Sequence, residues 1–347
     1  MPMLFFTIAT LAPVALIAAG AVLGAPWVWL ALLWMTVLTA TLDALVRRVL
    51  PATAGEEFPA ANALSVAIAL AQLALVALAV RGLAGGALTG WEKLALFLSA
   101  GLFLGQVGNA NAHELIHRGA RILRGLGVAA YVSVLFGHHA SAHVLVHHVR
   151  AATPGDPNSA RAGEGLWRFL PRAWAGSFRE GLRAETARRR RAGRPVLTHP
   201  YVIYLAGALA TVALAAAIGG WRGVLWLLAL AGYAQLQILM ADYVQHYGLT
   251  RALRDNGRPE PVAMRHSWNS AHPASSALML NAPRHSDHHA HPMRPYPALT
   301  LPGEAPLLPH SLPVMAVIAL VPPLWRRVMD PRVRRWQAGD RSGSRPI

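Results

Sequence analysis

The chain has 347 residues, of which 54% are hydrophobic and 14% are charged, whereas about 25% are charged in a typical soluble domain. This balance predicts an integral membrane protein. The net charge is +16, but the basic residues lie between apolar runs, which argues against nucleic-acid binding. Because the chain has no cysteine, cysteine-ligated haem, iron–sulfur clusters, thiolate zinc sites and disulfides are excluded.

Six apolar runs are long enough to cross a bilayer, which takes roughly 20 residues. They cover about residues 3–24, 27–46, 62–84, 92–112, 200–219 and 222–245. Short connections at residues 24–26 and 219–221 join the first two and the last two runs into hairpins. The first run lacks a basic flank, so we interpret it as a retained span rather than a signal peptide.

Four further segments are not expected to span the membrane. The stretch 124–137 is short and interrupted by glycine, which favours a re-entrant or interfacial helix, and 311–325 is also interpreted as interfacial. Segments 150–198 and 247–284 are polar and rich in proline and glycine, with too few apolar residues for a separate core. We therefore expect one domain over residues 1–347.

Arginines predict the orientation of the spans. They follow the second run (Arg47, Arg48) and the fourth (Arg118, Arg121, Arg124), and eleven more lie between residues 150 and 194. Basic residues accumulate on the cytoplasmic side of membrane proteins. The ends of the even-numbered runs and both termini are therefore predicted to face the cytoplasm.

The most informative polar residues are clustered histidines beside the apolar runs. Three clusters hold eight of the sixteen histidines: His113 and His117; His143, His147 and His148; and His285, His288 and His289. Spacings of three and four place imidazoles on one helix face, where they can share a metal ion. One zinc ion takes four ligands, so eight candidates favour two metals.

Residue types alone leave the metal open. Imidazole ligands suit zinc, copper, iron or nickel. His147 and His148 cannot both point along one helix face, so one of them is expected to face a second ion or the opposite side of the same ion. The string HELIH also matches the HExxH pattern of zinc proteases, with Glu114 as general base.

Five motifs in chain order resemble one enzyme family. They are HELIHR (113–118), HVLVHHVRAATPGDPNSAR (143–161), DYVQHYGL (242–249), HSWNS (266–270) and RHSDHH (284–289). Together they resemble the alkane 1-monooxygenases, also called alkane omega-hydroxylases, within the membrane-bound histidine-rich di-iron desaturases and hydroxylases. The resemblance covers roughly residues 90–300.

This resemblance implies an all-α bundle of six transmembrane helices with a cytoplasmic histidine-rich cap that holds two irons. The ligands implied by matching motifs are His113, His117, His143, His147, His148, His246, His285, His288 and His289. Only His246 is new relative to the spacing argument. The implied reaction uses O2 to hydroxylate the end of an alkane, with a rubredoxin-type donor and its NAD(P)H-dependent reductase, in the bacterial inner membrane.

The sequence departs from the family pattern at several points. Ala142 stands where the family has glutamate, Ala271 stands where aspartate is expected, and Val-Leu-Val at 144–146 replaces a polar triplet. Residues 282–283 are Ala-Pro instead of Leu-Gln. These changes remove acids that could orient histidine ligands.

A few other residues are candidates for supporting roles. His138, Glu114, Asp156 and Asp287 are expected around the histidine ligands, where carboxylates can accept hydrogen bonds from imidazoles. Trp34 lies deep in the second run and is a candidate for the wall of a substrate tunnel.

Three other functions remain open from the sequence. A fatty-acid desaturase or another hydroxylase would share the histidine motifs. An intramembrane zinc protease would need only HELIH and one further ligand. A metal transporter would need polar groups in several spans, and the first three runs carry almost none.

Overall fold

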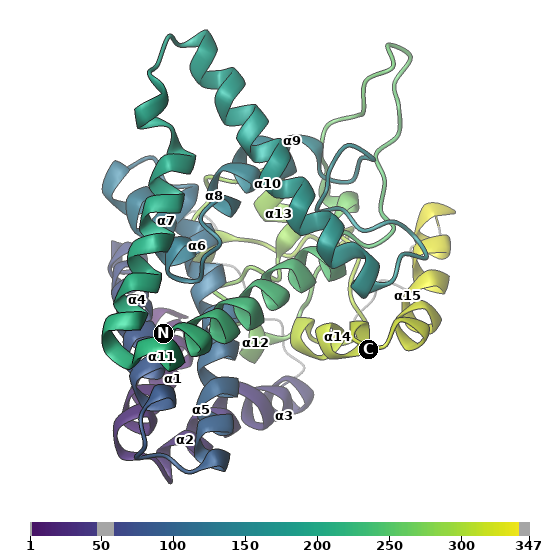
Figure 1. The fold of residues 1–347 in the computed structure, drawn as a ribbon. Helices are drawn as coiled ribbons and strands as arrows, with labels where there is room; N and C mark the ends of the chain where they lie inside the picture. The colour runs from purple at the N-terminus through teal and green to yellow at the C-terminus, as the bar shows by residue number, and fades with distance from the viewer. Residues whose placement is uncertain (1, 47–58, 340–347) are drawn as a thin grey trace.

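The computed structural model describes residues 2–46 and 59–339, and the regular structure in these ranges is helical (Figure 1). Extended pairing in the described ranges is limited to two isolated bridges, which join Leu253 to Pro259 and Asn269 to Leu307. The predicted all-α class is confirmed. Arg47 and Arg48, which entered the orientation argument, lie outside the described residues.

Five helical segments of the described chain are long and apolar enough to cross a membrane. They are Met3–Leu23, Trp27–Leu45, Ala60–Ala84, Gly90–Ile116 and Pro200–His246. Their elements are α1 (Pro2–Leu23), α2 (Trp27–Leu33), η1 (Trp34–Leu38), α3 (Thr39–Leu45), α4 (Pro59–Ala84), α5 (Gly90–Phe103), η2 (Leu104–Gly108), α6 (Asn109–Ile116) and α11 (Pro200–His246). The third and fourth predicted runs fall inside one of these segments each, and the first two extend one residue beyond theirs.

The last two predicted runs are the two halves of α11, which spans 47 residues. Gly219 and Gly220 leave the helical region, and Gly220 has a left-handed φ of 59°. A Cβ at Gly223 would lie 2.2 Å from the carbonyl oxygen of Ala215, so the halves approach too closely there for a side chain. Figure 1 shows α11 changing direction at this break, at the predicted connection between the runs.

The connection between α1 and α2 is held against α5. Thr89 caps α5 and receives a hydrogen bond from the Glu92 amide, while the Glu92 side chain accepts one from the Thr89 amide. The other carboxylate oxygen of Glu92 accepts a hydrogen bond from the Ala25 amide at 2.8 Å. One capping box therefore starts α5 and fixes the first hairpin beside it.

The remaining helices lie between the fourth and fifth spans and after the fifth, and several of them carry histidines. They are α7 (Arg121–Ser133), α8 (His139–Ala142), η3 (His143–His147), α9 (His148–Arg150), α10 (Leu166–Arg191), η4 (Val196–Thr198), η5 (Met264–His266), α12 (Pro273–Leu278), α13 (His285–Ala290), η6 (Tyr296–Ala298), α14 (Leu312–Ala319) and α15 (Pro322–Gln337). At 13 residues, α7 is too short to cross a bilayer, as expected for the stretch 124–137.

Helix α10 is the main element that the sequence did not predict. It runs for 26 residues through the segment 150–198, which was expected to be polar and rich in proline and glycine. Phe169, Ala173, Ser177 and Gly181 recur every four residues, are buried, and form one face of this helix. The many arginines on its other faces lower its average hydrophobicity and hide this periodicity.

Candidate metal centre

The nine histidines of the predicted ligand set lie together in two groups. In each group, one ring nitrogen per residue lies within 4.8 Å of those of the other members. The five-histidine group consists of His113, His117, His143, His148 and His288. The four-histidine group consists of His147, His246, His285 and His289. Among the described residues, these are the two clusters that could hold a metal ion.

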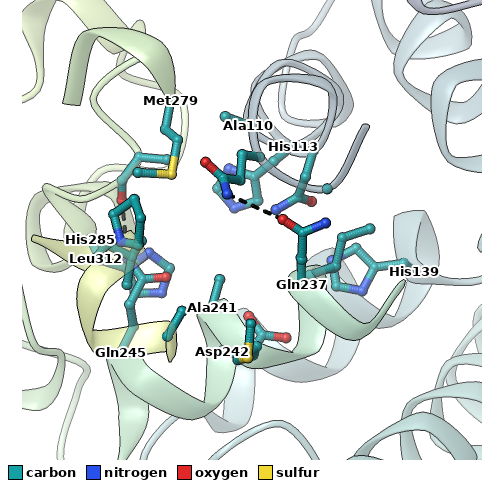
Figure 2. A pocket seen from close by; sticks show the side chains of 18 of the residues that line it. Ala110, His113, His139, Gln237, Ala241, Asp242, Gln245, Met279, His285 and Leu312 are labelled. Carbon is teal, nitrogen blue, oxygen red and sulfur yellow. Dashed lines mark hydrogen bonds between the residues drawn. The ribbon is translucent and has the colours of Figure 1, made fainter. Parts of the chain in front are cut away.

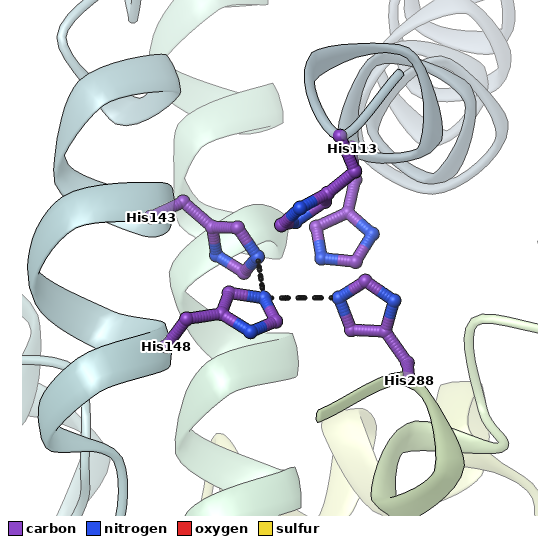
Figure 3. Close-up of side chains that lie close together, drawn as sticks. His113, His143, His148 and His288 are labelled. Atoms are coloured by element: carbon purple, nitrogen blue, oxygen red, sulfur yellow. Dashed lines mark hydrogen bonds between the residues drawn. The ribbon is translucent and has the colours of Figure 1, made fainter. Parts of the chain in front are cut away.

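The five-histidine group is assembled from distant parts of the chain (Figure 3). Helix α6 contributes His113 and ends at His117, one helical turn later, so both imidazoles lie on one face. The ring of His113 packs between those of His143 and His288, with centroids 4.3 and 4.2 Å away. The group therefore depends on the packing of α6, η3, α9 and α13.

A π-helical turn explains how the second histidine cluster is divided. Residues His143–His147 form η3, in which hydrogen bonds span five residues instead of four. This geometry brings His143 and His148 onto one face, with their Nε2 atoms 2.9 Å apart. His147 points instead to the four-histidine group. The expectation that His147 and His148 face different directions therefore matches this geometry.

The four-histidine group joins η3, α11 and α13. His246 ends α11, and its Nε2 lies 2.9 Å from Nε2 of His285. His285 and His289 are one turn apart on α13, with Nε2 atoms separated by 3.1 Å. All four residues are buried. His288, between them in sequence, points to the five-histidine group, so α13 serves both groups.

The arrangement of nitrogens fits a pair of metal ions. Nε2 of His148 lies 2.9 Å from Nε2 of His143 and 3.0 Å from Nε2 of His288, so one nitrogen faces two others. Nε2 of His117 and of His147 is buried without a hydrogen-bond partner. Buried nitrogens are normally hydrogen-bonded. A cation in the centre of each group would satisfy these lone pairs together.

Burial keeps most of these imidazoles in the neutral form that binds metals. Desolvation, aided by neighbouring histidines, holds the pKa of His143, His148 and His288 well below the ordinary value. Burial likewise lowers the pKa of His117 to about 4. A neutral imidazole offers a lone pair to a metal without losing a proton.

His147 differs because a carboxylate accompanies it. Its Nδ1 lies 2.8 Å from Oδ2 of Asp156. Burial opposes protonation of His147, but the charge and hydrogen bond of Asp156 raise the pKa of the imidazole above its ordinary value. Asp156 also accepts a hydrogen bond from the Ser159 hydroxyl. The pair fixes the ring so that Nε2 faces the other three histidines.

The other residues expected around the ligands have different contacts. Glu114 pairs with Arg118 and accepts a hydrogen bond from the Tyr296 amide at 3.1 Å. His138 packs against aromatic rings of Phe136 and Trp174 instead of against a histidine of the two groups.

Asp287 binds the loop that follows α13. Its carboxylate accepts hydrogen bonds from Arg294, from the Thr300 amide and from Nδ1 of His291. Burial alone would raise its pKa, but these three partners hold it below the ordinary value. Asp287 therefore holds the loop that follows α13 in place. The histidine that contacts its carboxylate is His291, which belongs to neither histidine group.

Ala142 lies at a close contact between α8 and α10. A Cβ built on Gly181 of α10 would lie 3.1 Å from the Cβ of Ala142 and 2.5 Å from the hydroxyl oxygen of Tyr201. Gly181 therefore allows the close approach of these two helices.

Two cavities lead to the histidines. The inner cavity, of about 70 Å³, is lined by His113, His143 and His285 (Figure 2). The outer cavity, of about 450 Å³, lies between the second span, α5, the second half of α11 and α14. The two share wall residues, namely Gln106, Gln237, Met240, Pro313 and Ala316. The two cavities therefore adjoin, and Gln106 and Gln237, which are hydrogen-bonded to each other, belong to the wall of both.

The sequence did not single out two titratable residues of the inner cavity. His139 lines this cavity with a buried and unpartnered Nδ1. Asp242, which begins the DYVQHYGL motif, lines it too and accepts a hydrogen bond from Asn158. The position of Asp242 one helical turn before His246 is the sequence signal that could have identified it. Trp34 is not among the residues lining either cavity, whereas Met35 lines the outer one.

Comparison with known proteins places these features in context. The family model described as fatty acid desaturase matches residues 89–305. Alkane 1-monooxygenase 1 of Pseudomonas aeruginosa is 38% identical over 255 residues, which cover 72% of this chain and 66% of that protein. Alkane 1-monooxygenase 2 of the same organism is 37% identical over 258 residues, covering 73% and 68%.

A relative that is named for a different substrate also matches. The xylene/toluene monooxygenase hydroxylase component XylM of Pseudomonas putida is 30% identical over 230 residues, covering 65% of this chain and 60% of that protein. The matched region thus spans about two thirds of the length of the more similar relatives.

Proposed function

Because this chain belongs to the fatty acid desaturase family, and within it to the group of the alkane 1-monooxygenases, we propose that it is a membrane monooxygenase of hydrophobic substrates. It inserts one oxygen atom of O2 into a C–H bond, and the proposed reaction is terminal hydroxylation of an alkane to a primary alcohol. The other oxygen atom is reduced to water, and this reduction consumes two electrons and two protons.

The observation that carries this proposal is the pair of histidine groups at the end of an apolar cavity. Nine imidazoles from separate helices converge in two groups, and three of them line the cavity. A single zinc site would need four ligands. An intramembrane protease is disfavoured because the Glu114 carboxylate, its required base, is engaged by Arg118 and the Tyr296 amide.

The histidines are proposed to hold two iron ions, which would supply the reduction of O2 and the oxidation of the C–H bond. The five-histidine group would bind one ion and the four-histidine group the other. Asp156 holds His147 in the orientation that presents Nε2. The apolar cavity walls exclude water and place a hydrocarbon beside His113 and His143.

The electrons are proposed to come from another protein, since a chain without cysteine has no iron–sulfur cluster or redox-active thiol pair of its own. The proposed donor is a rubredoxin-type protein with its NAD(P)H-dependent reductase. The basic charge of the chain would attract an acidic donor, although the positive-inside rule already accounts for the arginines.

The proposed location is the bacterial inner membrane, with the histidines and both termini on the cytoplasmic side. This orientation rests on the arginines that follow α6 and on the basic α10. It places the histidine groups where a cytoplasmic electron donor can reach them.

Metal analysis of the purified protein tests the proposal most directly. Two irons per chain, with the Mössbauer spectrum of a histidine-ligated iron pair, are expected. The exposed histidine variant His310→Asn should keep both irons, whereas His288→Ala should lose iron. One zinc per chain, or activity that survives His288→Ala, would point to a protease-like site instead.

A second function is favoured by the family model itself, whose description is fatty acid desaturase. A desaturase would remove two hydrogens from an acyl chain, whereas a hydroxylase would add oxygen. Product analysis with an alkane, an aryl methyl compound and an acyl lipid separates these reactions. Incorporation of labelled oxygen from O2 into the organic product identifies the hydroxylase.

A further inference from the structure

Asp43 is a carboxylate within the second membrane-spanning segment. It lies on α3 near the end of the segment Trp27–Leu45 and is 4% exposed. Ionisable residues inside the membrane are costly and mark functional positions by default. One oxygen has an evident structural partner, because Oδ1 accepts hydrogen bonds from the amides of Ala274 and Ser275 at 2.8 and 3.1 Å.

The second oxygen of Asp43 has no hydrogen-bond partner, and Asp43 belongs to the wall of the outer cavity. Oδ2 is buried and has no hydrogen bond, and Asp43 is the one charged residue among the described residues that line this cavity. Two hydroxyl groups of the same wall are already satisfied, since Thr36 donates to the Leu32 carbonyl and Thr39 to the Trp34 carbonyl. Two oxygens of lining residues thus lack a partner, Oδ2 of Asp43 and Oε1 of Gln106, and only the first belongs to a carboxylate.

We propose that Oδ2 of Asp43 binds the hydroxyl end of a chain-like substrate, so that primary alcohols are oxidised at the opposite, methyl end. This inference rests on the proposed monooxygenase function. A hydroxyl donates one hydrogen bond to the free oxygen and fills the unmet capacity of the carboxylate. An ammonium group fits less well, because burying it in an apolar cavity carries a desolvation cost.

The layout of the cavities orients such a substrate. Asp43 lines only the outer cavity, and the histidines line only the inner one. The side chains of Val37 and Val317, which also line the outer cavity, are 58% and 64% exposed, so this cavity opens towards the bilayer. A chain held at Asp43 extends its apolar end along the shared wall to His113.

The reaction at that end has the same balance as alkane hydroxylation. One oxygen atom of O2 enters the terminal C–H bond, and the other leaves as water with two electrons from the donor and two protons. The product is a diol with hydroxyl groups at both ends. Asp43 takes no part in the oxidation; it selects which end of the molecule reaches the metals.

The test uses Asp43→Asn in the full-length protein. Asparagine can keep an oxygen towards the amides of Ala274 and Ser275, but it replaces the free acceptor with an NH2 donor. The ratio of kcat/KM for 1-decanol to that for n-decane should fall about tenfold or more, because a hydrogen bond to a carboxylate is lost. Methyl nonanoate, which offers an acceptor, should gain relative to n-decane.

Thr36→Val is the matched control, because its hydroxyl lines the same cavity but is bonded to the backbone. This variant should leave the ratio for 1-decanol and n-decane unchanged. An equal ratio in the wild type and in Asp43→Asn would overturn the proposal, as would a fall of the same size in Thr36→Val.

A binding measurement separates this inference from the proposed function. In nanodiscs, 1-decanol should raise the Tm of the wild type more than n-decane does, and Asp43→Asn should remove the difference. If the protein oxidises neither compound but shows this difference, the monooxygenase proposal fails and the alcohol site stands. If the Tm shifts are the same in both proteins, the alcohol site is rejected.

Discussion

The two histidine groups differ in how firmly the protein holds them. In the four-histidine group, His147 is tied to Asp156, which is itself bonded to Ser159, and every member is buried. In the five-histidine group, no hydrogen bond joins a carboxylate to a histidine within the described residues, and His113 and His148 are only partly buried. The comparison indicates that the four-histidine group is held more firmly than the five-histidine group, whose members His113 and His143 line the inner cavity together with His285.

The largest expected effect comes from substituting two neighbouring residues, His147 and His148, in separate variants. Each substitution by alanine should remove one of the two irons per chain and abolish activity, because each takes a ligand from a different group. The remaining iron should give a different Mössbauer signal in the two variants. Identical signals would show that the π-helical turn does not divide the cluster, and His310→Asn serves as the control.

A smaller effect is expected from loosening the four-histidine group through Asp156→Asn. Loss of the carboxylate partner of a ligating histidine typically lowers metal affinity about 10–100-fold. Iron titration of the metal-free protein should show weaker binding at one site only. Equal weakening at both sites would remove the distinction between the two groups.

The stability of α13, which serves both groups, should depend on Asp287. Because its folded pKa is depressed, its contribution is present above the unfolded value of about 3.9 and is lost as the pH falls through the folded value. Asp287→Asn should lower the free energy of unfolding by about 2 kcal/mol at neutral pH. Thermal unfolding at several pH values should show this difference vanish in acid; a pH-independent difference would contradict the argument.

The smallest effect concerns the cavity in front of the five-histidine group. Met35→Ala should enlarge the outer cavity and raise the ratio of kcat/KM for long to short alkanes about tenfold. Trp34→Ala, the variant predicted from the sequence to accept longer chains, should have less effect because Met35 lines the cavity and Trp34 does not. Substrate profiles of the two variants compare neighbouring positions directly; a larger shift from Trp34→Ala would restore the original expectation.

Much of the architecture followed from local pattern. The apolar runs became helices at the predicted positions, since runs of that length satisfy their backbone hydrogen bonds internally. The spacing of His113 and His117, and of His285 and His289, places each pair on one helix face in the structure. These features depend on neighbours within a few residues, so one sequence is enough to predict them.

Other features required the whole fold. In the sequence, arginines hide the periodic buried face of α10. In the structure this face contacts α8, an element that is distant in sequence. The sequence did not single out Asp43, whose Oδ1 finds its partners only when α12 packs against α3.

The sequence by itself determined which residue types gather near the membrane and which helices carry them. The tertiary structure decided how nine histidines divide into five and four, because the division depends on a π-helical turn at η3 and on α13 lying between both groups. Helical spacing sets the direction of a side chain relative to its own axis. Which group that side chain joins is set by the packing of helices far apart in the chain.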